Sequence, residues 1–480
     1  MRITHARILT GLCTAAPMSA HAHGFGALYN LPVPLWLYGW GATATLVLSF
    51  LIAAVLLRAP AEPRPPRHWV APSVAATPWL LAAGRITAVL ILLLCLATAW
   101  FGHRDPLRNF SMSFFWIVFL LLFTYVAALV GNLYGALNPW RTLANWIATR
   151  VSGFSQGRYH YPKQLGHWPA LGLYMGFIAF ELFGTGRPVP LGWFLAGYTL
   201  LNLIAVWLVG ARAWFRYGEF FAVFFRLVAL MAPLALRDGR LILRWPCAGL
   251  LEQRPEHIST VCFALAMLAT TAFDGLRATH WWVALFWSDP TGWLTQWTGV
   301  RPIQAIALVR PWFSAWEWLW LFASPFLYLA AYLLTIRLAK RLTGTPRSTR
   351  ALALDFGYTL LPIAVVYHAT HYFTLLLNHG LKIISLASDP FGWNWNLFGT
   401  AFKFRAPILP DMAWVWHSQV VLILLGHVIS VWIAHRIALR VFGSRRAAML
   451  SQLPMLALMI ALTVAGLWIL AQPLTTMRIH

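Results

Sequence analysis

The chain has 480 residues, of which 60% are hydrophobic and only 10% are charged, and it contains 28 tryptophans. These proportions lie far outside the range of soluble domains, so they exclude a soluble globular protein and predict a membrane protein. The formal net charge of +23 would suit a nucleic-acid-binding protein. The distribution of the basic residues, described below, argues instead for a topological role and against nucleic acid as a partner.

The first residues have the pattern of a secretory signal peptide. A basic stretch, Met1–Arg7, precedes an apolar stretch, Ile8–Ala20, and the small-residue site Ala20-His21-Ala22. We expect residues 1–22 to be removed, which leaves 23–480 as a single transmembrane helical domain. His23 would then be an outward-facing amino terminus, whose amine and imidazole together form a chelate for a divalent metal.

Apolar runs of about 20 residues recur to the end of the chain, and each is long enough to cross a bilayer as a helix. The sequence therefore predicts an all-α polytopic helix bundle with about ten spans plus interfacial helices. The predicted spans are Trp36–Leu57, Leu81–Phe101, Met112–Gly131, Trp168–Gly184, Leu191–Gly210, Thr260–Phe286, Trp316–Ile336, Phe356–Asn378, Ser418–Ile437 and Met449–Leu470.

The basic residues fix the expected orientation of these spans. With the mature N-terminus outside, the segments on the inner side hold 23 Lys and Arg, whereas the outer segments hold 9. An excess of Lys and Arg in cytoplasmic loops is the positive-inside rule. We therefore expect the lipid bilayer, with anionic lipid on its inner face, to be the main partner of the chain.

One apolar segment does not fit this scheme as a span. Glu219–Leu236 is apolar, but Arg226 lies near its centre, and a span here would reverse the orientation of everything downstream. We expect residues 219–236 to form an interfacial helix on the cytoplasmic face.

Two short segments of the chain resemble each other. Ala278-Thr279-His280 precedes Ser288-Asp289-Pro290, and Ala369-Thr370-His371 precedes Ser388-Asp389-Pro390. In each segment an Asp-Pro pair follows a histidine at the outer side, so a repeat that frames a central site is one interpretation and chance is the other.

Ionisable groups are costly inside a bilayer, so each one in a predicted span is a candidate for function. At a rise of about 1.5 Å per residue, His280 and His371 lie roughly 10 Å below the outer ends of their spans, and Asp274, His368 and His427 lie roughly 15–18 Å deep. Seven of the thirteen acidic residues fall at the outer face or in the middle and outer half of the membrane. This predicts an outward-open cavity lined by carboxylates and imidazoles.

These residues suggest a site of hydrolysis. His368 and His371 share one helix face, and Asp274 is a further ligand or an orienting group. Three or four His and Asp ligands would suit zinc, copper or another divalent ion that activates water. We take Asp274, His280, His371 and His417 as candidate catalytic residues. The candidate metal ligands are His23, His368, His371, His427 and Asp274.

Three other interpretations remain open. A single histidine in a span commonly forms a hydrogen bond between helices. Haem ligation by His368, His371 or His427 is a second alternative, although no matched histidine pair recurs on two helices. A transporter or metal-handling protein that uses the same groups as an ion or proton relay is the third.

Several motifs in order along the chain resemble the fenitrothion hydrolase family of polytopic bacterial membrane proteins. The resemblance covers most of the chain and rests on the order of individually unspecific motifs. These are His23-Gly24 with Leu31-Pro32-Val33-Pro34-Leu35-Trp36, Asn138-Pro139-Trp140-Arg141, Phe273-Asp274-Gly275, Ala369-Thr370-His371-Tyr372-Phe373, Ser388-Asp389-Pro390 and Leu397-Phe398-Gly399-Thr400.

The resemblance implies a hydrolase of organophosphorus triesters in the bacterial inner membrane. It also implies a hetero-oligomer with a related membrane subunit, and it supplies no catalytic residues of its own. An apolar triester would partition into the bilayer and reach a site on the periplasmic side. The expected function is therefore hydrolysis of an apolar small-molecule substrate at the outward-facing His/Asp site.

Overall fold

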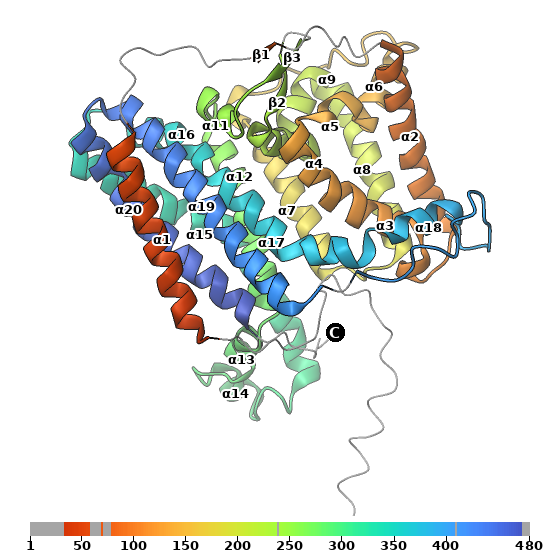
Figure 1. The fold of residues 1–480 in the computed structure, drawn as a ribbon. Coiled ribbons are helices and arrows are strands. Elements are labelled where there is room, and N and C mark those ends of the chain that lie inside the picture. The colour runs from red at the N-terminus through yellow and green to blue at the C-terminus, as the bar shows by residue number, and fades with distance from the viewer. Residues whose placement is uncertain (1–32, 58–68, 71–77, 238–239, 409, 473–480) are drawn as a thin grey trace, which may run out of the picture.

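The computed structural model describes residues 33–57, 69–70, 78–237, 240–408 and 410–472. The predicted signal peptide and His23 lie outside these residues. Nine helical segments of the described residues are long and apolar enough to cross a membrane, which confirms the all-α polytopic bundle (Figure 1). They are α1 (Leu35–Leu56), α2 (Pro78–Phe101), α3 to α4 (Phe110–Val130), α8 (Pro188–Val209), α12 (Ile258–Arg277), α15 (Ile306–Thr343), α16 to α17 (Thr349–His379), α19 (Met412–Phe442) and α20 (Arg445–Ala471).

Two of the ten predicted spans differ from the helices observed. The fourth forms α7 (Trp168–Phe183), whose 16 residues reach only about 24 Å, less than the hydrocarbon thickness of a bilayer. The sixth is interrupted: α12 ends at Arg277, and α13 (His280–Trp287) begins as a separate helix. The break occurs because the Thr279 hydroxyl accepts a hydrogen bond from the backbone N–H of Trp282 at 3.2 Å and caps a new helix.

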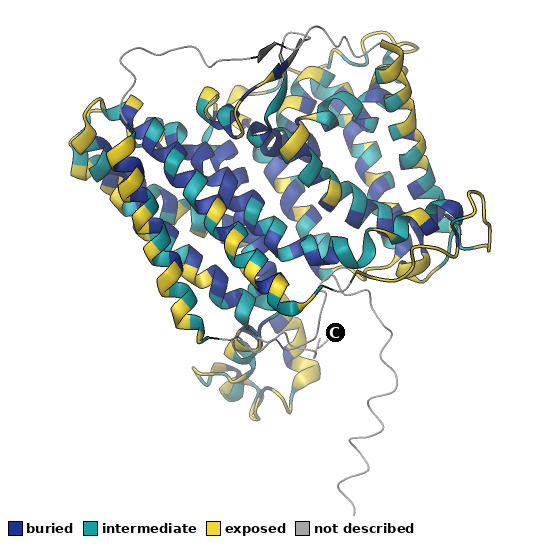
Figure 2. Ribbon diagram, in the orientation of Figure 1, coloured by how far each residue is buried: buried dark blue, intermediate teal, exposed yellow. Residues whose placement is uncertain are grey.

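Helices α12 and α17 (Leu361–His379) form the centre of the bundle (Figure 1). α1, α15, α19 and α20 pack together on one side of them, and α2, α7 and α8 lie on the other. α12 is enclosed almost completely by protein, whereas α1, α2 and α20 expose apolar side chains along their outer faces (Figure 2). A helix that is apolar all round must be buried in protein or in lipid, so the exposed faces indicate contact with lipid.

Three short helices are parts of the spans already named: α3 (Phe110–Ser113), α4 (Phe123–Val130) and α16 (Thr349–Phe356). The other short helices lie between spans. They are α5 (Leu133–Leu137), α6 (Pro139–Ala148), α9 (Ala211–Ala213), α10 (Phe220–Val228), α11 (Ala248–Glu252), α14 (Trp293–Thr298) and α18 (Lys382–Ser388). A small antiparallel sheet of order β1-β3-β2, which the sequence did not predict, lies at one end of the bundle. Its strands are β1 (Trp69–Val70), β2 (Leu234–Arg237) and β3 (Arg240–Leu243).

The segment expected to be an interfacial helix on the membrane surface differs from that expectation. Every residue of α10 except Arg226 is buried, and the chain turns into β2 after Met231. The phenylalanines of α10 pack into an aromatic cluster with residues of α7 and α8. Arg226 is half-buried, and protein groups bind its Nη2, which donates to the carbonyl oxygen of Arg216 at 2.7 Å and lies 3.1 Å from His167 Nε2.

A buried carboxylate fixes the start of α10. Glu219 is 0% exposed and accepts hydrogen bonds from the backbone N–H groups of Phe221, at 3.1 Å, and Ala222, at 2.8 Å. The hydroxyls of Tyr134 and Tyr198 and the amide of Asn138 donate to the same carboxylate. This arrangement satisfies the orphan N–H groups at the helix start and holds α10 against α5, α6 and α8.

The two similar Asp-Pro segments form similar turns. Asp289 accepts backbone hydrogen bonds from Leu294 and Thr295, and Asp389 accepts them from Trp393 and Asn394. The preceding histidines are not equivalent, because one begins α13 and the other lies within α17. The structural similarity is therefore confined to the turns.

Candidate functional site

A cavity of about 470 Å³ lies between α7, α10, α12, α17 and the wide-turn helix η2 (Phe114–Leu122). Its mouth is formed by Asp105, Leu107, Gly186 and Arg187, which are all exposed in the loops before α3 and after α7. Buried phenylalanines of α10 line its interior. The volume lies within the usual range of small-molecule sites.

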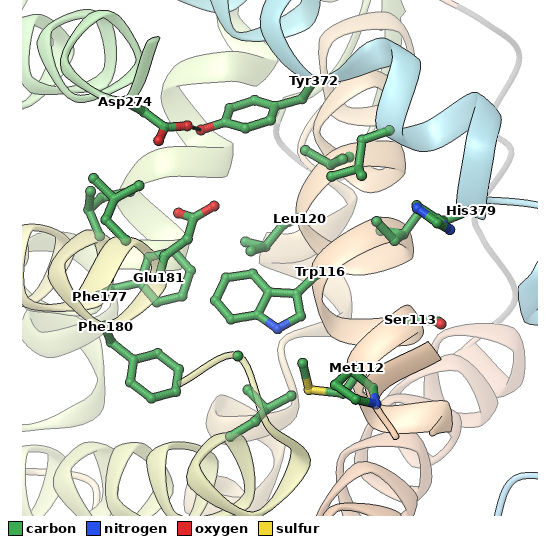
Figure 3. Close-up of a pocket in the computed structure, with 18 of the residues that line it drawn as sticks. Met112, Ser113, Trp116, Leu120, Phe177, Phe180, Glu181, Asp274, Tyr372 and His379 are labelled. Carbon is green, nitrogen blue, oxygen red and sulfur yellow. Dashed lines mark hydrogen bonds between the residues drawn. The ribbon is translucent and has the colours of Figure 1, made fainter. Parts of the chain in front are cut away.

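Asp274 of α12 is a buried polar group on the cavity wall that is bound by two neighbouring side chains. It is 2% exposed. The Tyr372 hydroxyl of α17 donates to Asp274 Oδ2 at 2.9 Å, and His371 Nε2 lies 3.1 Å from the same oxygen (Figure 3 shows the tyrosine contact). Two donors from one neighbouring helix therefore orient this carboxylate and disperse its charge. Asp274 lines the cavity whereas His371 does not, so His371 supports Asp274 from behind.

Gly275, next to Asp274, allows α12 to pack closely against α20. A Cβ atom on Gly275 would lie 2.8 Å from Ile469 Cγ2 of α20, a distance that requires a shift, and 3.4 Å from His371 Cε1, which is ordinary contact. The missing side chain therefore sets the approach of α20 to the part of α12 that carries Asp274.

A second carboxylate points into the same space. Glu181 of α7 lines the cavity, and Figure 3 shows its carboxylate directed toward the space beside Asp274 and Tyr372. The guanidinium of Arg277 lies at this end of α7: its Nη1 donates to the Leu182 carbonyl at 3.0 Å, and its Nε lies 3.3 Å from Glu317 Oε1. The cavity thus presents two acidic side chains from two different helices.

The remaining wall is mainly aromatic and aliphatic. The Trp116 ring stacks near Phe177, with ring centres 5.8 Å apart, and near Phe180, at 6.2 Å. Trp116, Leu120 and Leu121 all lie on the wall because η2 is a π-helix, in which residues four and five apart share one face. Wide helical turns of this kind often occur at functional sites.

His368 is the predicted metal ligand that lies on the cavity wall together with Asp274. Its ring centre lies 4.8 Å from that of Tyr372. Among the residues that the structure describes, the buried His368 Nδ1 and the buried Asn378 Oδ1, on another wall residue, have no hydrogen-bond partner. Unsatisfied buried polar atoms are uncommon and indicate a place for water or a ligand.

The other predicted histidines do not converge on this cavity. His280 is exposed at the start of α13, because the sixth span breaks before it. His417 is exposed near the start of α19, and its Nδ1 bonds the Ala413 carbonyl at 2.7 Å. His427 is buried in α19, where its Nδ1 bonds the Ile423 carbonyl at 2.8 Å. The prediction that these three histidines lie close to Asp274 was based only on their expected depth in the membrane.

The predicted divalent metal, zinc or copper, does not fit the groups that are present. Within the described ranges, no three or more His, Cys, Asp or Glu side chains are grouped so that they could hold a metal ion. His368, His371 and Asp274 are neighbours, but His371 contacts Asp274 itself. We therefore derive no step through a metal.

Sequence reasoning missed two important residues. Tyr372 stands four positions after His368, which is a helical spacing for one face, and beside His371 in the chain. Glu181 lies near the end of α7 and was not among the predicted site residues. Partial burial lowers the pKa of Lys382 in α18, and attraction to Asp105 opposes this shift.

Comparison of the chain with protein-family models, curated proteins and solved structures finds no match. The functional argument therefore rests on the cavity and its side chains.

Proposed function

We propose that this protein is a membrane-embedded hydrolase of an apolar, uncharged ester. The organophosphorus triesters implied by the sequence resemblance are the substrate class to test first. The observation that carries the proposal is Asp274, a carboxylate oriented by Tyr372 and His371 on the wall of a largely apolar cavity. A fixed acidic group in a cavity shielded from bulk water is well suited to general base catalysis.

The proposed reaction uses Asp274 to activate water. The apolar part of the ester packs on the wall around Trp116, and a water molecule beside Asp274 attacks the phosphorus atom as Asp274 takes its proton. The bond from phosphorus to the aryl oxygen then breaks, and the aryloxide leaves as an anion without a strong general acid. Asp274 then passes its proton to solvent water. The restored carboxylate, together with that of Glu181, repels the anionic phosphodiester and aryloxide, which favours their release through the mouth.

We place the mouth of the cavity on the periplasmic side of the inner membrane. The support is the excess of Lys and Arg in the segments predicted to lie at the opposite ends of the spans. The cleaved signal peptide and the related membrane subunit stay predictions.

A transporter is the second candidate, because the cavity extends from exposed residues to buried ones. Its mouth residues are exposed, and the buried Phe220 and Phe224 line its interior. Intramembrane carboxylates such as Asp274 and Glu181 commonly carry protons in transporters.

One experiment separates the two candidates. The full chain in lipid nanodiscs is incubated with diethyl 4-nitrophenyl phosphate, and nitrophenolate release is followed. The same compound is then offered to proteoliposomes with and without a pH gradient. Release in nanodiscs that Asp274→Asn abolishes and the exposed Asp411→Asn retains supports the hydrolase. Gradient-driven accumulation of intact ester without release supports the transporter.

A further inference from the structure

Two loops pack against each other beside the mouth of the cavity. Residues 102–109 follow α2 and include the mouth residue Asp105, and residues 389–408 follow α18. The backbone N–H of His103 donates to the Phe391 carbonyl at 2.9 Å and joins the two segments. We call these two segments, which form one continuous surface, the mouth loops.

The end of α2 places the mouth loops at the level of the lipid headgroups. α2 exposes apolar side chains along its outer face, and its last residue, Phe101, is 68% exposed. The edge of the hydrocarbon layer therefore lies near Phe101. His103 follows two residues later and can lie at most about 7 Å farther out, and the headgroup layer is roughly 5–7 Å thick on each side of a bilayer. The hydrogen bond from His103 holds Phe391 at the same level.

The second of the mouth loops exposes a large apolar surface. Phe398, Phe402 and Phe404 are 71%, 68% and 48% exposed, and Trp393 is 53% exposed. Figure 1 shows this blue loop projecting from the edge of the bundle beside α18, and Figure 2 shows it mostly in yellow. Exposed apolar surface of this extent marks contact with a membrane or a partner. Tryptophan in particular is enriched where a membrane meets water.

Basic residues gather on the same surface. The segments predicted to lie outside hold nine Lys and Arg, and five of these belong to the mouth loops or to α18: Arg104, Arg108, Lys382, Lys403 and Arg405. The acidic residues of these segments are Asp105 and Asp389, which leaves an excess of three positive charges. Such an excess attracts anions, including the phosphates of anionic lipids.

Three of these cations lie close together. Arg405 Nε lies 3.4 Å from Ser385 Oγ, one turn along α18 from Lys382. Partial burial lowers the pKa of Lys382, attraction to Asp105 raises it, and repulsion by Arg405 and Arg108 lowers it further. Positive charge is therefore concentrated where α18 packs against the mouth loops.

We propose that the mouth loops dock on the headgroup layer of an anionic bilayer, with their aromatic side chains between the headgroups and their basic side chains on lipid phosphates. Arg405 joins the two parts, because its guanidinium lies 5.0 Å from the centre of the exposed Phe402 ring. A membrane is favoured over a protein partner because this surface begins where a lipid-facing helix ends. The docked loops hold the cavity mouth within the headgroup layer. The inference concerns lipid binding alone and does not require the proposed hydrolysis.

The first test measures the depth of the loop in the membrane. Phe398→Cys, in a Cys13→Ser background, is labelled with the fluorophore NBD and placed in nanodiscs, and the other native cysteines are buried. The control is Gln304→Cys, an exposed position near α14, which projects beyond the rest of the bundle in Figure 1. A nitroxide on the lipid headgroup should quench the dye at position 398 at least threefold more strongly than at 304, and iodide in the water should show the reverse. Iodide access at 398 equal to that at 304, or shielding of 398 from both quenchers, would overturn the proposal.

The second test measures the preference for anionic lipid. At equal mole fraction, 5-doxyl phosphatidylglycerol should quench the dye at position 398 at least threefold more strongly than 5-doxyl phosphatidylcholine, because each nearby Lys or Arg attracts anionic lipid. The double change Arg108→Gln and Lys403→Gln should lower this ratio at least twofold. The matched double change Arg301→Gln and Arg310→Gln, at exposed basic residues outside the mouth loops, should leave it unchanged. Equal quenching by the two lipids would overturn the proposal. Loss of the preference in inorganic phosphate at constant ionic strength would also overturn it, because the site would then bind a free anion.

Discussion

The Tyr372 hydroxyl donates a hydrogen bond to Asp274 Oδ2 at 2.9 Å, which joins the two central helices of the bundle on the cavity wall. Removal of this donor by Tyr372→Phe should reduce ester hydrolysis by about tenfold or more, because a hydrogen bond to a charged group contributes about 1.5–3 kcal/mol. The measurement is kcat for nitrophenolate release in nanodiscs. A Tyr159→Phe variant, altered in an exposed loop away from the cavity, should retain native kcat. Native kcat in Tyr372→Phe would show that the hydroxyl does not assist Asp274.

Two glycines give a matched test of helix packing. Gly275→Ala would place a Cβ atom 2.8 Å from Ile469 Cγ2 of α20, so one of the two helices must shift, and the shift should disturb the neighbouring Asp274. We expect a fall of several-fold in kcat and a loss of about 1–3 kcal/mol in stability, as in other overpacked cores. Gly172→Ala, where nothing lies within 4 Å of the added Cβ, is the control. Equal effects of the two substitutions on kcat would contradict a dependence of Asp274 on the close packing of α12 against α20.

Glu219 should be a major determinant of stability. In Glu219→Ala, the hydroxyls of Tyr134 and Tyr198 and the amide of Asn138 lose their buried acceptor. We expect a cost of about 3–5 kcal/mol, the range seen when one partner of a buried charged network is removed. Thermal unfolding in detergent measures this cost.

The exposed Glu256 provides the comparison for Glu219. Its contact with Arg216 lies in solvent, with about half of each side chain exposed. Glu256→Ala should therefore change stability by about 1 kcal/mol or less. Similar losses in the two variants would mean that α10 does not depend on its buried cap.

Acid should destabilise the protein in part through His167, just before α7. Burial, together with the nearby positive charge of Arg226, lowers the pKa of this histidine to about 3. The unfolded chain takes up the proton near the ordinary value of 6.5, so this contribution to stability is complete above pH 6.5 and is lost as pH falls toward 3. His167→Gln should flatten the fall of Tm between pH 6.5 and 4.5. An unchanged slope would show that other groups control the acid response.

Cysteine labelling tests the orientation of the cavity mouth. Arg187→Cys, at the mouth, should react with a membrane-impermeant maleimide in intact spheroplasts, and Arg350→Cys, at the start of α16, should react only after permeabilisation. The native Cys95, Cys247 and Cys262 are buried and should give little background. Burial also raises the pKa of Cys247 to about 11, which suppresses its thiolate. The reverse labelling pattern would invert the proposed topology.

The sequence predicted the helices well because their signal is long and strong. A run of about twenty apolar residues is typical of a membrane-spanning helix and of few other structures. Eight of the predicted spans correspond closely to observed helices. Position along a helix predicted different depths for Asp274 and His371, whereas their side chains lie 3.1 Å apart, because α12 ends at Arg277 and Asp274 is close to that end. Depth does not give rotation about the helix axis, however, and this is why His417 and His427 were assigned to a site that they do not face.

Local chemistry accounts for the other differences. One threonine, Thr279, ends the sixth span early and leaves His280 outside the bundle. The aromatic surroundings of α10 bury a segment that the arginine at its centre had placed on the membrane surface. Such features depend on partners distant in the chain, which apolar periodicity alone cannot identify. Glu181 and Asp274 belong to two helices that are far apart in the chain, so the sequence pattern could not show that they line the same cavity.

The most direct test of the account is the turnover of Asp274→Asn beside that of the native chain, in the same nanodiscs and at saturating nitrophenyl phosphotriester. We predict that kcat falls by about 100-fold or more, the usual contribution of a general base, while KM changes little because the substitution preserves shape. A kcat within twofold of the native value would contradict the account, because the carboxylate on which the proposed chemistry rests would then not take part in it.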